Sequence, residues 1–289
     1  ASSDTAVGNG LAHALAMESL LGVTPPPSAT RLRSVALEVE RLASHFSDLG
    51  GICADIGFLG GAAVYARLRG TALGMGEVLS GSRFLTGYVR PGGVRRAPTA
   101  DQAAAMRADA EVLVRQAGEA RALLFDNTGS LNRMEDVGTV SPSLARDFGL
   151  VGPAARACGL AYDARSGVRV CTRTSGDVLG RVEVRADEVE VSLAMIIEGL
   201  SHPDDGPVRV SLPDRLAPSS VGVGRVEAWR GELVHLVITD GEGRVGRYAI
   251  KDPSFDNWTG LAIAARGELV SDFPLCNKSF GLSYSGNDL

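Results

Sequence analysis

Hydrophobic residues recur with helical spacing over the first two-thirds of the chain. In RLRSVALEVERLASHFSDLGG the apolar positions follow one another at alternating steps of three and four: Leu32, Val35, Val39, Leu42, Phe46 and Leu49. Such a stripe predicts one long amphipathic helix. The preceding PPPSAT supplies a start signal, with Ser28 or Thr30 as the cap, and Gly50-Gly51 supplies the expected stop.

Two further apolar stripes predict long helices. One begins near Thr99 or Asp101, ends before Asn127, and contains Met106, Ala110, Leu113, Ala117, Ala120 and Leu124. The other runs from about Leu179 to Leu200 and contains Val189, Leu193 and Ile196. Between Cys53 and Phe84 we expect another long helix, interrupted by several glycines.

The pattern changes after His202. The segment VGVGRVEAWRGELVHLVITDGEGRVGRYAI is rich in β-branched residues, and Asp240-Gly241 offers a turn between two strand-like runs. We therefore expect a small antiparallel sheet of two or three strands, followed by a short helix around Trp258 to Arg266 and a polar tail. The predicted fold class is mainly α with a small β part (α+β). It forms one domain over residues 1–289, with a helical core (1–202), a β appendage (about 203–252) and a C-terminal helix and tail (253–289).

Composition and charge exclude several classes of protein. The 289 residues are 45% hydrophobic and 22% charged, as in a globular protein. The net charge is −5 and no basic cluster is interleaved with aromatics, so nucleic acid is not an expected ligand. The most apolar stretch, Ile52 to Leu68, contains Asp55 and falls short of the roughly 20 apolar residues of a membrane span. The chain opens on Ala1 without a methionine, which we interpret as a fragment of a longer protein.

The cysteine spacing gives no metal motif. Cys53, Cys158, Cys171 and Cys276 form no C-x-x-C pair, so neither a zinc ribbon nor an iron–sulfur cluster is indicated. We expect buried, reduced thiols and no metal bound by this chain.

Polar residues on the predicted helices carry the candidate chemistry. Arg181, Arg185, Glu188 and Ser192 share one face of a helix, where surface ion pairing and a functional role are equally compatible with the pattern. TSGD, before that helix, offers Ser175 or Asp177 as a cap.

Two histidines lie on other predicted helices. His45 shares a helix face with Glu38 and Arg41, and a buried set of ion pairs is favoured there over a catalytic triad, because no nucleophile accompanies it. His13, in the apolar LAHALAME, fits a satisfied core residue better than a proton donor.

Several long segments together resemble one family. ALEVERLASHFSDLGGICADIGF, GDVLGRVEVRADEVEVSLAMI, GRVEAWRGELVHLVITDGEGRVGRYAIKDPSFDNW and DFPLCNKSFGLSYSGNDL are similar, in order, to the large subunit of group 4 nickel–iron hydrogenases (formate hydrogenlyase subunit 5-like), a family shared with the 49-kDa subunit of respiratory complex I. The resemblance implies a long-helix bundle of the hydrogenase large-subunit type. It also implies an upstream domain like the 30-kDa subunit of complex I.

The resemblance places non-ligand residues where the catalytic members hold nickel and iron. Those members use two C-x-x-C pairs, and thiolates are the soft ligands such a cluster needs. Ser283 and Gly286 stand at the second pair, and the first pair falls near Ser2 and Thr5. Hydrogenase activity is therefore not expected. The resemblance implies a vacated cavity lined by these four residues and a buried tail.

The complex I branch of the family implies a quinone in that cavity. His13 stands where that branch has a tyrosine that binds the quinone headgroup, and His13 and Asp177 are the candidate polar groups of an acceptor site. Arg185 and Glu188, on the polar helix face that also holds Arg181, match polar positions of a helix that packs near the cluster-bearing neighbour in complex I. NADH binding is not indicated within the chain, because no G-x-G-x-x-G lies between a strand and a helix.

These implications lead to two hypotheses. In the first, the chain is a metal-free subunit of a complex I-like or hydrogenase-related oxidoreductase at the inner face of the cell membrane. Its implied partners are an iron–sulfur small subunit, which would carry the clusters, and membrane-embedded antiporter-like subunits. In the second, the chain is a purely structural scaffold without a redox site, and its own tail fills the cavity.

Overall fold

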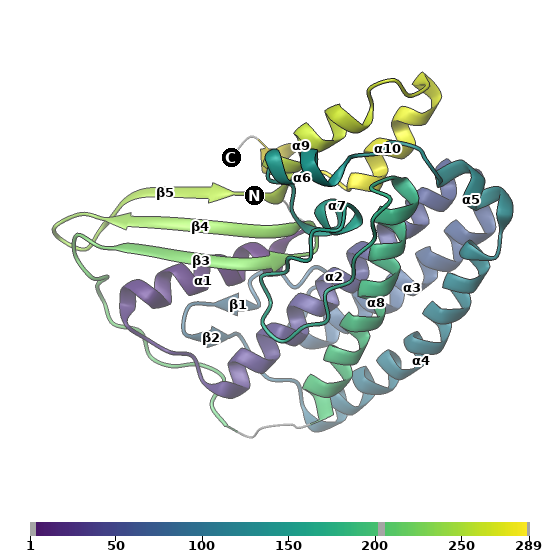
Figure 1. Cartoon of the computed structure of the whole chain (residues 1–289). Helices are drawn as coiled ribbons and strands as arrows, with labels where there is room; N and C mark the ends of the chain where they lie inside the picture. The colour runs from purple at the N-terminus through teal and green to yellow at the C-terminus, as the bar shows by residue number, and fades with distance from the viewer. Residues whose placement is uncertain (1–3, 202–205, 288–289) are drawn as a thin grey trace.

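Long helices form the main body of the protein (Figure 1). The structure is a computed structural model that describes residues 4–201 and 206–287. Its α-helices are α1 (Ala6–Leu21), α2 (Pro27–Asp55), α3 (Leu59–Ser80), α4 (Ala100–Phe125), α5 (Thr128–Met134), α6 (Pro142–Asp147), α7 (Gly152–Ala157), α8 (Val178–Ser201), α9 (Pro253–Ala264), α10 (Phe273–Phe280) and α11 (Tyr284–Asn287), with a 3₁₀ turn η1 (Val270–Asp272). Helix α2 packs against α3 and α8, and α4 closes the bundle by contacting the same two helices.

The apolar stripes predicted from the sequence form the centre of this bundle. All six residues of the α2 stripe are buried, as are the stripes of α4 and α8. Thr99 caps α4 in a capping box with Gln102, and Asp177 Oδ1 accepts the N–H of Gly180 at the start of α8. The prediction of a mainly α fold with a small sheet is confirmed.

Helix α2 does not stop at Gly50-Gly51, so that prediction is wrong. A Cβ at Gly50 would lie 3.2 Å from the Cβ of Tyr65 on α3, and one at Gly51 would lie 2.8 Å from Cδ of Lys278. The two glycines therefore leave room for neighbouring elements, and the helix continues to Asp55.

A three-stranded antiparallel sheet covers α1 (Figure 1). It consists of β3 (Val221–Ala228), β4 (Gly231–Thr239) and β5 (Val245–Lys251), in that order. A Cβ at Gly224 would lie 1.8 Å from the carbonyl oxygen of Ala12, so glycine allows β3 to approach α1 closely. Ala228 pairs with Gly231, which leaves Trp229 and Arg230 as a two-residue turn.

A second, two-stranded ribbon was not predicted. It pairs β1 (Val89–Arg90) with β2 (Gly93–Val94), and an isolated bridge joins Gly93 to Arg209. Among the described residues, no helix combines the length and apolar character needed to span a membrane.

Candidate functional site

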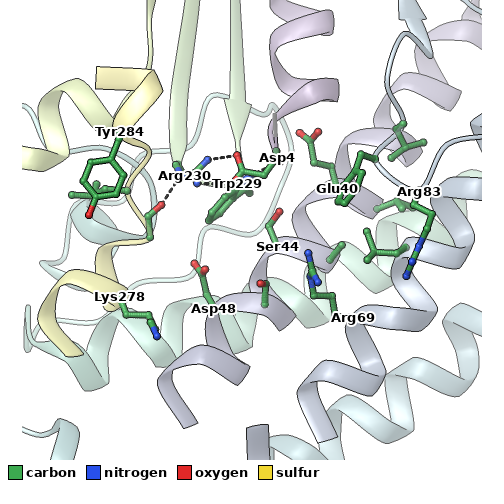
Figure 2. A pocket seen from close by; sticks show the side chains of 18 of the residues that line it. Asp4, Glu40, Ser44, Asp48, Arg69, Arg83, Trp229, Arg230, Lys278 and Tyr284 are labelled. Carbon is green, nitrogen blue, oxygen red and sulfur yellow. Dashed lines mark hydrogen bonds and ion pairs between the residues drawn. The ribbon is translucent and has the colours of Figure 1, made fainter. Parts of the chain in front are cut away.

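A pocket of about 260 Å³ lies where α2, α3, the β3–β4 turn and the C-terminal segment meet. Figure 2 shows its labelled side chains converging from these elements. The lining residues are Asp4, Val39, Glu40, Ala43, Ser44, Ser47, Asp48, Arg69, Leu73, Arg83, Phe84, Leu85, Trp229, Arg230, Asn277, Lys278, Gly281, Leu282 and Tyr284. Apolar side chains and charged groups therefore share one cavity, as in many small-molecule sites.

Arg230 holds three separate segments together at one end of this pocket. Its guanidinium pairs with both oxygens of Asp4 at 2.8 and 2.7 Å and donates to Thr5 Oγ1 at 3.0 Å. It also donates to the carbonyl of Gly281 and stacks on the Trp229 ring, with Cζ 3.8 Å from the ring centroid. The start of the described chain, the hairpin turn and the tail are thus joined by one side chain.

Some charged side chains of the pocket have ion-pair partners and others have none among the described residues. Asp48 lies 3.0 Å from the Arg185 guanidinium of α8, although burial still raises the pKa of Asp48. The side chains of Arg69 on α3 and of Arg83 after it form no hydrogen bond or ion pair with any other described residue. Two arginines therefore remain available to a ligand or a partner at this wall.

Glu40 is the most deeply buried carboxyl of the pocket. Its side chain accepts the N–H of Val7 at 2.6 Å and the N–H of Gly8 at 3.0 Å. Its pKa is raised to about 8, chiefly by burial and also by the nearby charge of Asp4, while these two hydrogen bonds act in the opposite direction.

The candidate residues of the tail lie beside the pocket and do not line it. Ser283 is buried, its N–H donates to Ser254 Oγ, and its own Oγ accepts the N–H of Gly286. Gly286 packs against Asp252, where a Cβ would lie 2.5 Å from the carboxyl carbon. Their neighbours Gly281, Leu282 and Tyr284 line the pocket instead.

Only part of the predicted tail is buried. Ser283 and Gly286 are buried, but Tyr284 is 71% exposed at the pocket. At the other predicted ligand position, Thr5 is buried beneath Arg230 and Asp4 lines the pocket in its place. Ser2 lies outside the described residues.

His13 belongs to a hydrogen-bonded chain between α1 and the sheet. Its Nδ1 lies 2.9 Å from Tyr248 Oη, which lies 2.6 Å from His235 Nδ1. His235 Nε2 then lies 3.1 Å from Asn9 Oδ1, and the Asn9 amide donates to the carbonyl of Thr5. Burial lowers the pKa of His13 and brings that of His235 to about 4, so both rings are neutral at pH 7.

Asp177 lies at the start of α8, away from the pocket lining. Its carboxylate accepts the N–H of Asp136 at 2.9 Å and the hydroxyl of Ser175 at 2.6 Å, besides capping the helix. His13 and Asp177 are therefore not brought together, and each is engaged in local hydrogen bonds.

The polar face of α8 is buried, so its interpretation as surface ion pairing is wrong. Arg181, Arg185, Glu188 and Ser192 are each at most 2% exposed. Arg181 donates to Ser279 and to two backbone carbonyls, which ties α8 to α10. Arg185 reaches the pocket indirectly, through Asp48.

Glu188 joins the buried charge cluster, which comprises Glu38, Arg41, His45, Arg156, Asp163, Arg165, Glu188 and Glu227. Arg156 lies 2.8 Å from both Glu188 and Glu227, and His45 Nε2 lies 2.8 Å from Glu188. Burial alone would raise the pKa of Glu188, but Arg156 and His45 hold that pKa well below its usual range. The predicted buried ion pairs of α2 are confirmed within this cluster.

Comparison with known proteins now decides the family. The model described as "Respiratory-chain NADH dehydrogenase, 49 Kd subunit" matches residues 55–224 and 214–288. The chain belongs to this 49-kDa subunit family. The resemblance stated from the sequence is thereby confirmed.

Individual relatives come from two branches of the family. Formate hydrogenlyase subunit 5 of Escherichia coli is 33% identical over 96% of this chain and 51% of the relative's length. NADH-quinone oxidoreductase subunit 4 of Thermus thermophilus is 34% identical, and the match covers 91% of this chain and 73% of the length of that subunit. The chain thus spans about half of the hydrogenlyase subunit and nearly three-quarters of the quinone oxidoreductase subunit.

A solved structure confirms the fold. A chain from the membrane-bound sulfane sulfur reductase, an archaeal respiratory membrane complex, superposes with a TM-score of 0.87 and 26% sequence identity. The match covers 97% of this chain and 79% of the other.

The described residues do not fit the nickel–iron cluster of the hydrogenase branch. The four cysteines are buried away from the pocket lining, and no described cluster of three or more His, Cys, Asp or Glu side chains could hold a metal ion. The hydroxyl of Ser283 is engaged by a backbone N–H, and Gly286 offers no side chain.

Sequence reasoning missed Glu40, Asp48 and Arg230. Ala36, Leu37 and Ala43 lie three or four positions from Glu40 on the same helix, and a carboxylate beside such apolar neighbours could have drawn attention to Glu40. Arg230 follows Trp229 at a two-residue turn, but only the folded hairpin shows that this turn points into the pocket.

Proposed function

We propose that this chain is a subunit of a membrane-associated oxidoreductase complex related to complex I and formate hydrogenlyase, and that its pocket takes a quinone-type electron acceptor. The observation that carries the proposal is the pocket itself, which adjoins both former ligand segments. Asp4 and Thr5 approach it from one side and Gly281 to Tyr284 from the other, joined by Arg230.

The chemistry of the pocket suits a flat acceptor with polar oxygens. Leu73, Leu282 and Trp229 offer apolar surface to a ring, and Ser44 and Ser47 offer hydroxyl donors to carbonyl oxygens. Electrons would come one at a time from iron–sulfur clusters of a small partner subunit, and membrane-embedded antiporter-like subunits would complete the complex at the inner face of the cell membrane. These partners are proposed from the family.

The scaffold hypothesis is less well supported. It requires the chain's own tail to fill the cavity, but Ser283 and Gly286 pack against α9 and the residue before it, and about 260 Å³ stays open. His13 and Asp177 remain candidates from the family comparison, although neither lines the pocket.

A pair of matched serine variants tests the proposal. Ser44→Phe places a ring inside the pocket, whereas Ser34→Phe places the same ring on the exposed side of α2. In the assembled complex, we expect Ser44→Phe to abolish binding of a short-chain quinone analogue, measured by titration calorimetry, and Ser34→Phe to leave it unchanged. Equal binding by the two variants would contradict the proposed site, as would failure of the parent complex to bind the analogue.

A further inference from the structure

Glu40 differs from the other carboxylates of the pocket in its partners. Asp4 is paired with Arg230 and Asp48 with Arg185, but Glu40 forms no ion pair with any described residue. Its two oxygens accept only the N–H groups of Val7 and Gly8, in the first turn of α1. Glu40 is 7% exposed and lines the pocket.

The surroundings of Glu40 favour a neutral carboxylic acid at neutral pH. Burial raises its pKa most and Asp4 adds to the rise, whereas the two N–H bonds and Arg41 on the same helix oppose it, and the net pKa is about 8. The other charged groups lining the pocket are Asp48 on α2, Arg69 and Arg83 on the wall formed by α3 and the residues after it, Arg230 at the turn and Lys278 on α10. An acid with a pKa near the working pH is suited to donate a proton and to regain it.

We infer that Glu40 is the residue that donates a proton to the acceptor bound in the pocket, an assignment that rests on the proposed function. A quinone becomes a hydroquinone by gaining two electrons, here from the iron–sulfur clusters of the partner subunit, and two protons. The Glu40 O–H bond breaks as an O–H bond forms on one quinone carbonyl oxygen. The second proton comes from water, and water also returns the proton to Glu40.

The hydrogen bonds of Glu40 suit the state that follows the transfer. The carboxylate left behind keeps the N–H groups of Val7 and Gly8, and these stabilise a negative charge more strongly than a neutral acid. Both donors lie at the N-terminus of the 16-residue helix α1, where the helix dipole also favours an anion. Loss of the proton from Glu40 therefore requires no rearrangement of the first turn of α1.

Replacement by glutamine removes the proton but keeps an acceptor oxygen for α1. In the assembled complex, we expect Glu40→Gln to bind a quinone analogue within about twofold of the parent and to lower the rate of quinone reduction roughly a hundredfold. The acid form is the donor, so the parent rate should fall as pH rises through about 8. This alkaline decline should be lost in Glu40→Gln, should return at a reduced rate in Glu40→Asp, and should persist in Glu77→Gln, which alters an exposed glutamate of α3.

The outcomes separate this assignment from the function on which it rests. If the parent complex binds the analogue and Glu40→Gln keeps both the parent rate and the alkaline decline, Glu40 is not the donor and the proposed function stands. If the parent does not bind the analogue, the proposed function fails and the assignment fails with it. Should Glu40→Gln not assemble, infrared spectra of the parent complex with labelled glutamate decide. We expect a carboxylic acid carbonyl band that titrates near pH 8, and its absence would overturn the assignment.

Discussion

The buried charge cluster and the pocket use the same kinds of side chain in opposite ways. In the cluster, Arg156 is fully buried and bonded to two carboxylates, and His45 bonds one of them. In the pocket, the side chains of Arg69 and Arg83 form no hydrogen bond or ion pair with a described residue, and Glu40 forms no ion pair with one. The ion pairs of the cluster link α2, α7, α8 and β3 to one another, whereas the unpaired groups of the pocket leave charge and protons available to a ligand.

The largest effect is expected from breaking the cluster. Arg156→Met leaves Glu188 and Glu227 buried without their shared cation, which should lower the free energy of unfolding by about 3–5 kcal/mol. Chemical denaturation of the purified protein measures this. The control is Arg115→Met, which removes an ion pair to Glu119 between side chains 66% and 63% exposed and should cost about 0.5 kcal/mol or less. Equal losses of unfolding free energy for the two variants would contradict the greater importance assigned to the buried ion pairs.

The second effect depends on pH and concerns Glu40. Below its ordinary pKa of 4.5 the carboxyl is protonated in the folded and unfolded chain alike. Between 4.5 and about 8 only the unfolded chain releases the proton, so stability falls as pH rises, and above 8 the loss is complete. At about 1.4 kcal/mol for each pKa unit, Glu40→Gln should gain several kcal/mol relative to the parent across this window. A stability difference that does not change between pH 5 and 8 would show that Glu40 is already ionised.

A smaller effect is expected where Arg230 joins three segments. Arg230→Met loses charge-assisted bonds to Asp4 and the bond to the Gly281 carbonyl, which should cost about 2 kcal/mol. Amide hydrogen exchange at Ser283 and Gly286 should accelerate, because the tail loses its link to the hairpin turn. The exposed Arg225 of β3 provides the comparison, and Arg225→Met should leave this exchange unchanged.

The smallest effect on stability is expected at the open wall of the pocket. Arg69→Gln and Arg83→Gln break no hydrogen bond or ion pair among the described residues, so each should change the free energy of unfolding by less than about 0.5 kcal/mol. If these arginines face an acidic partner or ligand, each variant should weaken assembly or binding, and the weakening should shrink at high salt. If either variant lost much stability without any effect on binding, these arginines would be structural residues like those of the buried charge cluster, which would contradict the comparison.

The sequence predicts the helices well because each apolar stripe is a local signal. The six stripe residues of α2 and the start of α4 near Thr99 or Asp101 needed no knowledge of distant contacts. The end of α2 needed such knowledge, because Gly50 and Gly51 accommodate α3 and Lys278. The same limit explains the polar face of α8, whose burial depends on neighbours from α2, α7 and α10.

The resemblance predicted a cavity lined by Ser2, Thr5, Ser283 and Gly286, and this assignment stays a prediction. The pocket adjoins both of the segments concerned, but Thr5, Ser283 and Gly286 do not line it. The side chains that line it are one or two positions away, because Thr5 bonds Arg230 and the Ser283 hydroxyl bonds the N–H of Gly286. Such hydrogen bonds decide which side chains of a short turn face a cavity. The spacing of residues along the chain does not predict these bonds.

The most direct test of the acceptor pocket is photoaffinity labelling of the intact complex with an azido-quinone, followed by peptide mapping. We predict labelling of α2 between Val39 and Asp48 and of the segment from Gly281 to Tyr284, suppressed by excess unlabelled quinone and by Ser44→Phe. Labelling that is confined to other parts of the complex, or that excess quinone does not suppress, would contradict the account.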